Sequence, residues 1–401
     1  MDNLNHLINE YGNPDILIDS NADSSKKYAI WGFDEIFEIN NQGAFLNGKA
    51  MQGDCLDVMQ NIFDKWKINN NNSNMACAGF ISYEFKKFIY KHIDFNDNKI
   101  SDFPYAWFCK PKIVREYESF TLENNINGVL DIIDDIIDIK EYKIKISKIK
   151  EFLKNGDVYQ INFTDFKKIH SNFTDPFNLY QVLRNIAKPA HGFFLHTNSF
   201  DILSLSPELF LQVINGEIYT SPIKGTRPSA FNHHEDIVLK KDLQNSIKDK
   251  AEHLMIVDLL RNDLGKICDI GSIKVYNLYR IQSFKTIHHM VTDIKGQLSK
   301  NITETDIIKA MFPGGSITGA PKESAMSIID TLEPQSRNIY TGNAGYILNN
   351  GDMSFNICIR TLLKTNNFYE YGIGGGIVWD SNAEDEWHEA QHKSKILEPL
   401  L

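Results

Sequence analysis

The stretch Ser221-Pro222-Ile223-Lys224-Gly225-Thr226-Arg227-Pro228 is the part of the chain around which the other motifs fall into place. Its prolines restrict the backbone at both ends, and its glycine permits a turn or the close approach of a ligand. The preceding residues 217–220 alternate apolar and polar side chains and predict a strand. Lys224 is therefore predicted where a strand gives way to a turn, a common place for a catalytic side chain. The alternative is a solvated lysine in a surface turn.

The composition is that of a soluble globular chain. It has 401 residues, of which 42% are hydrophobic and 23% charged, enough for a substantial core in one large domain or two ordinary ones. The formal net charge of −10 argues against a nucleic-acid partner, and any site for an anion then needs local cations or a metal.

The cysteines and the chain's N-terminus predict a cytoplasmic protein. The five cysteines are scattered and never spaced as CxxC, which fits reduced thiols better than disulfides or a zinc site. Residues 1–6 have neither the basic nor the apolar region of a signal peptide. The most apolar segment, 129–139, is interrupted by aspartates and is too short to span a membrane, so we expect no membrane partner.

A helix followed by a strand is predicted in the middle of the chain. Apolar residues at near-helical spacing predict a helix over 141–155, and Gly156 supplies its stop. Residues 156–164 change to period two and predict a strand, whose polar residues Gln160, Asn162 and Thr164 would share one face.

Two further predicted helices carry carboxylates. In the first, 248–264, Glu252 lies beside the apolar stripe, and it either complements the helix dipole or points inward. In the second, 381–397, Glu386, Glu389 and Lys393 share one face, for which an exposed salt-bridged face is the default interpretation. If the three glutamates met, they would need a cation, and oxygen-only ligands favour Mg²⁺.

A glycine-rich turn, Phe312 to Lys322, leads into a predicted helix over 323–332 and suits an anion. It lacks the spacing of a P-loop or of a dinucleotide fingerprint. Two strands are predicted after it, at 355–363 and 368–378, and the glycines 374–376 of the second predict a bulge when taken alone.

Taken in order, these motifs resemble the chorismate-utilising enzyme family, most closely its aminodeoxychorismate synthase branch. The first 140 residues match only loosely, and Ser229 stands where the family usually has a second arginine, which puts a local ion pair in doubt. The matching segments are 157–162, 206–208, 222–228, 251–263, 288–291, 312–322, 340–342, 359–361 and 374–378, together with Glu386 and Glu389.

The resemblance implies an α/β (α+β) fold, a two-sheet antiparallel β-sandwich with helices on the outside and a site between the sheets. Residues 1–140 would form the N-terminal part of the sandwich and 141–401 the chorismate-binding catalytic region. Leu17 to Ser20 faintly resembles the tryptophan-pocket segment of the anthranilate synthases, either as a remnant or as plain structure.

The resemblance also implies the site residues. Mg²⁺ would be held by Glu252 and Glu389, with Glu386 helping directly or through water. Lys224 would be the nucleophile, and His289 and Glu208 would move protons at the departing hydroxyl. The remaining substrate-binding positions would be Thr226, Ser316 and Thr318 of the closing turn, Tyr340, Arg360, Gly374, Gly375, Gly376, Lys393 and Gln160.

Two positions separate the reactions within the family. Isochorismate and salicylate synthases carry a lysine base where this chain has Gln160; glutamine cannot deprotonate water, whereas ammonia is already a nucleophile. Anthranilate synthases carry alanine at the position of Lys224. A lysine there can attack C2 of the ring and expel the C4 hydroxyl, after which ammonia attacks C4 and gives 4-amino-4-deoxychorismate. This requires a lowered Lys224 pKa, from burial or from Arg227.

By resemblance, ammonia would come from a separate glutamine amidotransferase (glutaminase) subunit, because no such domain is present up to Leu401. A separate lyase would then complete 4-aminobenzoate for folate synthesis. The first alternative is anthranilate synthase component I, which shares substrate, metal and ammonia but eliminates pyruvate. The second is a catalytically silent subunit that binds the glutaminase.

Overall fold

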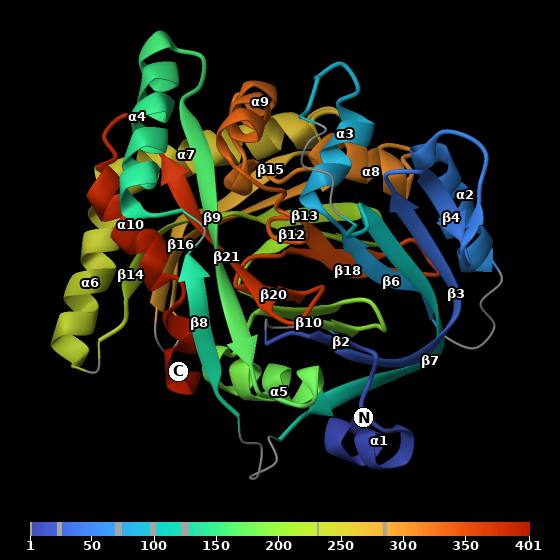
Figure 1. Ribbon diagram of the computed structural model, residues 1–401. Coiled ribbons are helices and arrows are strands. Elements are labelled where there is room, and N and C mark those ends of the chain that lie inside the picture. Colours follow the sequence, from blue (N-terminus) through green and yellow to red (C-terminus); the bar gives the residue numbers. More distant parts are fainter. Residues whose placement is uncertain are drawn as a thin grey trace.

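The computed structural model describes residues 2–21, 26–68, 74–96, 102–121, 128–135, 137–230, 232–283 and 287–401. Its strands form one hydrogen-bonded network with the helices outside it (Figure 1). Among these residues the named strands pair antiparallel except β1 (Asp2–Asn3), which lies parallel to β7 (Ala106–Ser119). The prediction of antiparallel sheets covered by helices is therefore confirmed.

The network consists of two arms that meet at β2 (Ile16–Asp19), which pairs with β3 on one edge and β10 on the other. The first arm runs in the order β15 (Lys274–Ser283), β16 (Ile287–Gln297), β13 (Glu217–Ser221), β12 (Leu209–Ile214), β19 (Met353–Ile357), β18 (Asn343–Leu348), β6 (Met75–Ile81), β7 and β3 (Tyr28–Asn40). The β4 (Gly43–Leu46) and β5 (Lys49–Ala50) strands extend β3, and β14 (Ile223–Pro228) pairs with β16 beside β13.

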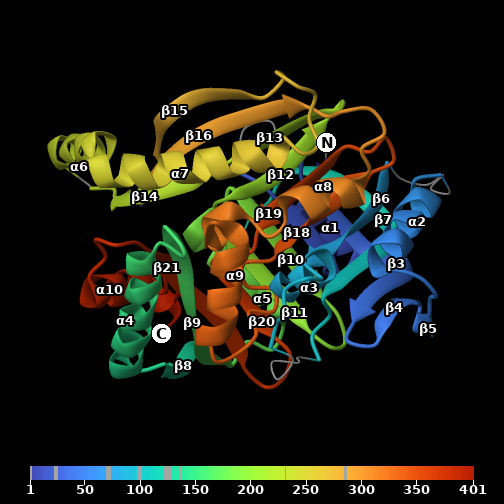
Figure 2. The same cartoon turned by 90° about the horizontal axis from the view of Figure 1, so that it is seen from above.

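The second arm carries the other wall of the site. It runs β10 (His191–His196), β11 (Asp201–Ser206), β20 (Thr361–Lys364), β21 (Tyr369–Ile377), β9 (Gln160–Ser171) and β8 (Leu130–Asp135), with the short β17 (Gly319–Ala320) paired to β9. Figure 2 shows β14 and β16, with the helices α6 and α7, lying over β9 and β21.

The helices pack against the outer faces of these strands. The ones nearest the site are α4 (Ile139–Asn155), α6 (His233–Asn245), α7 (Ile247–Leu264), α9 (Lys322–Leu332) and α10 (Ala383–His392). The others are α1 (Leu4–Tyr11), α2 (Cys55–Ile68), α3 (Lys86–Ile89), α5 (Pro176–Ala187) and α8 (Glu304–Met311), with short 3₁₀ turns η1 (Tyr83–Phe85), η3 (Gly315–Ile317) and η4 (Lys395–Leu400).

Residues at the helix ends explain why three of the predicted helices form where the sequence predicts them. The α4 helix ends at Gly156, which takes a left-handed conformation with φ 80°, as the sequence predicts. The α7 helix begins after Ser246, whose hydroxyl accepts a hydrogen bond from the amide of Asp249. The α9 helix occupies the range predicted for it within one residue. These three segments carry their own start and stop signals, so the sequence alone locates them.

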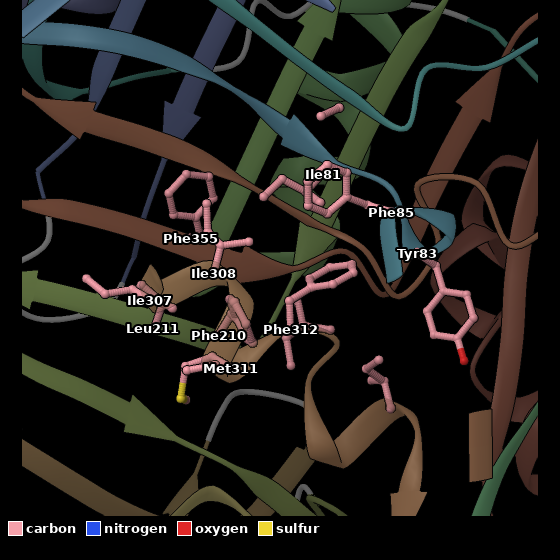
Figure 3. Packing of buried hydrophobic residues seen from close by; sticks show 14 of the residues in the cluster. Ile81, Tyr83, Phe85, Phe210, Leu211, Ile307, Ile308, Met311, Phe312 and Phe355 are labelled. Carbon is pink, nitrogen blue, oxygen red and sulfur yellow. The ribbon is translucent and has the colours of Figure 1, made fainter. Parts of the chain in front are cut away.

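An aromatic core supports the glycine-rich turn. Figure 3 shows Phe312 beside Phe85 and Phe210, from three separate segments of the chain. The ring centroids of Phe312 and Phe85 are 6.1 Å apart and those of Phe312 and Phe210 are 6.5 Å apart, both edge to face. Because all three side chains are buried, they fix the backbone that enters residues 314–318.

Several sequence predictions of local structure are wrong. Lys224 lies within β14 and not at a turn, because Gly225, with φ 75°, forms a bulge that lets the strand continue. The strand predicted at 355–363 is two strands, β19 and β20, separated where Arg360 adopts φ 51°. The strand predicted to begin at 156 begins at Gln160.

The last helix and the glycine run also differ from the prediction. The α10 helix ends at His392, and a 3₁₀ turn follows where the helix was expected to continue to 397. Residues 374–376 pair with β9 in regular register, with no bulge. Among the described residues, no helix is both long and apolar enough to cross a membrane.

Candidate active site

Lys224 points from β14 towards the turn 314–318. Its Nζ donates a hydrogen bond to the carbonyl oxygen of Ser316 at 3.1 Å. Burial lowers the pKa of this amine, and Lys393 lowers it further, while Glu252 and Glu208 act against the shift. The net effect is an amine that loses its proton more easily than an ordinary lysine, the property required of a nucleophile.

Arg227 does not cause this shift, contrary to one of the two sequence-based expectations. Its guanidinium is held away from Lys224 by two carboxylates, Asp242 at 2.6 Å and Asp249 at 3.1 Å. The bulge at Gly225 places the two basic side chains differently, because residues on either side of a bulge no longer alternate regularly. Burial, the other expectation, is the main cause.

Glu208 lies between β11 and β12 with only 4% of its surface exposed. Burial raises its pKa from 4.5 to about 7, and hydrogen bonds from the Ser316 side chain and the Ile223 backbone partly oppose that rise. Its Oε1 atom is buried and has no hydrogen-bond partner among the described residues. A carboxyl group of this kind can hold a proton near neutral pH and donate it.

His289 faces Thr226 across the β14–β16 pair. The Nδ1 atom of His289 lies 3.0 Å from Oγ1 of Thr226. Burial lowers the His289 pKa to about 3, with Arg360 adding to the effect, so the free protein holds a neutral imidazole at physiological pH. Of the two residues predicted to move protons, Glu208 is therefore the one that carries a proton to give.

Gln160 and Gly376 face each other from β9 and β21. A Cβ placed on Gly376 would lie 2.6 Å from Nε2 of Gln160 and 3.3 Å from Nζ of Lys224. Only glycine leaves this space open. Gln160 is fully buried, and neither polar atom of its amide has a hydrogen-bond partner among the described residues. Buried polar atoms of this kind are rare in native proteins and suit a bound ligand.

Among the described strands, β9 is the one paired with residues 374–376, because β20 pairs with β21 at 369–371. The expectation that their amides bind an anion is consistent with the edge opposite β9, which is open among the described strands. A Cβ on Gly375 would lie 3.5 Å from Nζ of Lys393, 3.7 Å from Glu386 and 4.0 Å from Glu389. The ends of these three side chains, two from α10 and one from the residue that follows it, therefore converge over Gly375. The ion pair of Glu389 with Lys393 is nevertheless exposed, with 62% and 38% of the two side chains accessible, as the default interpretation of this face expected.

Lys393 holds this end of the site together. Its Nζ donates to the carbonyl of Gly374 at 2.6 Å and lies 3.1 Å from Glu389. This lysine lowers the pKa of Glu389, whereas burial raises the pKa of Glu386 and of Glu252. The three carboxylates of the predicted metal site also act on one another electrostatically: Glu386 on Glu252, and Glu389 on Glu386.

The donor chemistry of this carboxylate group fits Mg²⁺, because every donor is oxygen and two of the carboxyl groups, those of Glu252 and Glu386, are half-buried with a raised pKa. The three carboxylates lie farther apart than the ligands of an ion that is bound by protein groups alone. Within the described ranges, no three acidic, histidine or cysteine side chains are close enough together to ligate one ion. Waters would have to complete the coordination, as Mg²⁺ commonly requires.

Arg360 and Tyr340 lie beside β21. Among the described residues, the half-buried guanidinium of Arg360 has no side-chain hydrogen bond or ion pair, and burial lowers its pKa. An arginine in this state suits a carboxylate ligand. The Tyr340 ring instead packs over Gly372, where a Cβ would lie 2.2 Å from it, and edge to face with Phe166 at 5.6 Å. The Tyr340 ring therefore lines the site by packing against Gly372 and Phe166.

The turn 314–318 contacts the other site residues mainly through its backbone carbonyl groups. The Thr318 hydroxyl is buried and donates to the Gly314 carbonyl at 2.9 Å, within its own turn. The Ser316 carbonyl accepts from Lys224, and its side chain bonds to Glu208. Of the two predicted substrate-binding residues in the turn, the structure gives Ser316 the direct connection to the proposed catalytic groups.

Sequence reasoning missed two residues, Glu333 and Arg337. They form a buried ion pair at 2.7 Å, with Arg337 only 1% exposed. The only available signal was their i,i+4 spacing, which predicts an ordinary surface pair. Their burial depends on segments distant in sequence.

The segment with a faint likeness to a tryptophan pocket borders a small cavity. Leu17 to Asp19 forms most of β2, and Ile18, Asp19 and Ser20 line a cavity of about 30 Å³ with His191. Asp19 is engaged by Arg184 and by the Tyr117 hydroxyl. Whether tryptophan binds there stays a prediction.

Comparison with known proteins shows the family. A model of the chorismate binding enzyme family matches residues 118–399. Anthranilate synthase component 1 of Saccharolobus solfataricus is 36% identical over 338 residues and 80% of each chain. Aminodeoxychorismate synthase component 1 of Escherichia coli is 43% identical over 65% of this chain, and that of Bacillus subtilis is 30% identical over 94%.

The matches differ in how much of each relative they cover. The matched region spans 89% of the Bacillus subtilis protein but only 58% of the Escherichia coli protein. Among solved structures, anthranilate synthase component I from Streptococcus pneumoniae superposes with a TM-score of 0.81 over 94% of this chain and 93% of that one, at 24% identity. The menaquinone-specific isochorismate synthase of Escherichia coli gives 0.75 at 15% identity, over 97% and 88%. These structures establish the fold.

Proposed function

The chain belongs to the chorismate-binding enzymes, and from that premise we propose that it converts chorismate and ammonia into 4-amino-4-deoxychorismate. The relatives include both aminodeoxychorismate synthases and anthranilate synthases, so family membership alone does not separate the two reactions.

The observation that supports the first of them is the state of Lys224. Its amine lies within the candidate site, between the Ser316 carbonyl and Gly376 of β21. The pKa of this amine is lowered. The anthranilate synthases are expected to have alanine at this position, where no covalent adduct can form. A half-buried amine with a lowered pKa reacts readily as a nucleophile, and perturbed groups of this kind gather at functional sites.

The proposed course has two displacements. The neutral Lys224 amine attacks C2 of the ring, the two conjugated ring double bonds both shift, and the C4–O bond breaks. Glu208, with a pKa of about 7, gives the leaving hydroxyl its proton, so that water departs. Ammonia then attacks C4, both double bonds shift back, and the C2–N bond to Lys224 breaks; the surplus proton on the new amine returns to Glu208.

Gln160 supports ammonia rather than water as the second nucleophile. Its amide is not a base, and it lies beside Lys224 over Gly376. Ammonia needs no base to attack, whereas water does. The two polar atoms of this amide, which have no hydrogen-bond partner in the described part of the chain, can instead hold the substrate or the incoming ammonia by hydrogen bonds.

We also propose that Glu252, Glu386 and Glu389 hold Mg²⁺. When bound, the ion would neutralise the ring carboxylate of chorismate and orient it. Arg360 and the open edge of residues 374–376 would take the remaining carboxylate oxygens. Ammonia would come from a separate glutaminase subunit, as the term component 1 in the relatives' names suggests, and the product would feed 4-aminobenzoate and folate synthesis.

Product analysis tests this proposal. The purified chain is incubated with chorismate, Mg²⁺ and an ammonium salt at mildly alkaline pH, with and without a lyase that converts aminodeoxychorismate into 4-aminobenzoate. Appearance of 4-aminobenzoate only with the lyase supports the proposal. Anthranilate without the lyase would assign the chain to the other branch, and untouched chorismate, even with a glutaminase present, would point to a silent subunit.

A further inference from the structure

The buried ion pair between Glu333 and Arg337 joins three segments that build the site. Nε and Nη2 of Arg337 donate to the two carboxylate oxygens of Glu333, at 2.8 and 2.7 Å. Oε1 of Glu333 also accepts from the amide and hydroxyl of Thr164 in β9, at 2.9 and 2.8 Å. The pair is therefore anchored to the strand that carries Gln160.

Arg337 also donates to backbone carbonyls of the site and, through Nη1, to the Thr341 hydroxyl at 3.2 Å. Nη2 donates to the carbonyl of Asn162 in β9 at 2.7 Å, and Nη1 donates to the carbonyl of Ile317 in the turn at 2.9 Å. Asn162 in turn donates its amide to the carbonyl of Thr318 at 2.8 Å. One guanidinium thus bridges β9 and residue 317 of the turn, in addition to the backbone hydrogen bonds that join β9 to residues 318–320.

Ser316, the neighbour of Ile317, contacts both proposed catalytic groups. Its carbonyl accepts the hydrogen bond from Lys224, and its side chain bonds to Glu208. A shift of the turn by a few tenths of an ångström would change both contacts. The Gly314 carbonyl is satisfied within the turn, by Thr318 and the Ile317 amide, whereas the Ser316 and Ile317 carbonyls accept from Lys224 and Arg337, which lie outside it.

Arginine is required by this geometry. A planar guanidinium can serve a carboxylate and two carbonyls in different directions at once, whereas a lysine ammonium is a single point of charge. The guanidinium also stacks on the Tyr83 ring, 4.4 Å from its centroid, which limits its freedom to tilt.

We propose that Arg337, oriented by Glu333, is a positioning residue that holds Ser316 where its carbonyl aims the Lys224 amine at the substrate. The role rests on the proposed function in that it assumes Lys224 to be the nucleophile. It predicts that loss of Arg337 lowers kcat and has little effect on KM, because substrate contacts stay in place while the nucleophile loses its orientation.

A double-mutant cycle tests the role. Chorismate consumption at saturating ammonium and Mg²⁺ is measured for Arg337→Lys, Lys224→Ala and the double variant. Arg337→Lys should lower kcat by roughly 30-fold with KM changed less than about threefold, and it should change the residual rate of Lys224→Ala less than about threefold. Equal losses in both backgrounds, or a rise in KM alone, would overturn the proposal.

The matched control is Arg184→Lys. Arg184 also forms a two-pronged, largely buried pair with a carboxylate, that of Asp19, but it lies on α5 and contacts no part of the turn. The melting temperature of this variant should fall about as much as that of Arg337→Lys. Its kcat should stay within about twofold of the kcat of the unmodified chain.

A second measurement does not depend on turnover. Competitive labelling of amines with acetic anhydride, followed by mass spectrometry, gives the reactivity of Lys224 relative to the exposed Lys241. Arg337→Lys should change that ratio at least about threefold, and Glu333→Gln should change it in the same direction. An unchanged ratio in folded variants would contradict the positioning role. The identity of the product made by the unmodified chain decides the proposed function separately.

Discussion

Lys224 and Gln160, which are 64 positions apart in the sequence, approach the same point above Gly376. A methyl group there would lie 3.3 Å from the Lys224 amine and 2.6 Å from the Gln160 amide nitrogen. The amine has a hydrogen-bond partner in Ser316, but the amide has none among the described residues. The pair therefore combines the proposed nucleophile, held by the protein, with an amide that has no partner among the described residues, as expected of a site that receives a small polar substrate.

Replacing Lys224 by alanine tests the nucleophile. We expect chorismate consumption to fall at least about 100-fold, because the covalent step is lost while the binding groups remain. The rate and products are followed by chromatography with ammonium as nitrogen source. The exposed Lys241→Ala variant on α6 should keep full activity. An unchanged rate and product for Lys224→Ala would remove the adduct from the mechanism.

Replacing Gln160 by leucine should separate stability from activity. The change removes two buried polar atoms that lack partners within the described ranges, so the free energy of unfolding should rise by about 1–2 kcal/mol. Turnover should fall at least about tenfold, since the open amide is the proposed contact to substrate or ammonia. Urea unfolding and initial rates give the two numbers. Leucine at the exposed Gln244 is the control, and a Gln160→Leu variant less stable than the parent would show that the amide is satisfied.

Replacing Glu208 by glutamine should stabilise the protein in a pH-dependent way. The folded-state pKa is about 7 against 4.5 for an ordinary glutamate, so the unfolded chain loses this proton first as pH rises. Stability contributed by the protonated group is therefore lost between about pH 4.5 and 7. Above pH 7 the Glu208→Gln variant should be more stable by at most about 3 kcal/mol, and the gain should vanish near pH 4.

Thermal unfolding from pH 4 to 8 measures this difference. Glu217→Gln is the control, and its stability should change with pH in the opposite direction, because a hydrogen bond from Tyr219 lowers the pKa of Glu217. A Glu208→Gln gain that stays constant with pH would mean that Glu208 is ionised throughout the range. Turnover of the same variant should fall about 100-fold if Glu208 supplies the leaving-group proton.

Magnesium binding can be tested without turnover. Titration calorimetry with MgCl₂ should show one site in the unmodified chain, and Glu252→Gln should weaken it at least about tenfold, because one of three carboxylates is lost. Glu384→Gln is the control: Glu384 lies on α10 with Glu386 and Glu389 but pairs with Lys143 on the surface, at 3.3 Å. Equal binding by both variants would exclude Glu252 as a ligand.

The sequence located the elements that carry their own boundaries. Gly156 ends α4 and Ser246 begins α7 through local hydrogen bonds and conformational preference, so nearby residues suffice to predict them. The sequence did not predict local structure that depends on contacts with distant segments. The bulge at Gly225 keeps Lys224 in a strand through pairing with β16, and the positive φ of Arg360 divides a segment whose composition is uniformly strand-like.

The same division applies to the site. The residue types and their order in the chain, with a lysine at 224, a glutamine at 160 and glutamates at 252, 386 and 389, determined by themselves the family and the chemistry to expect, because reaction type depends on which functional groups are present. Only the tertiary structure decided the state of those groups. Burial lowers the pKa of Lys224 and raises that of Glu208, and Arg337 is buried by three segments that no local pattern brings together, since desolvation and long-range hydrogen bonds exist only once the chain is folded.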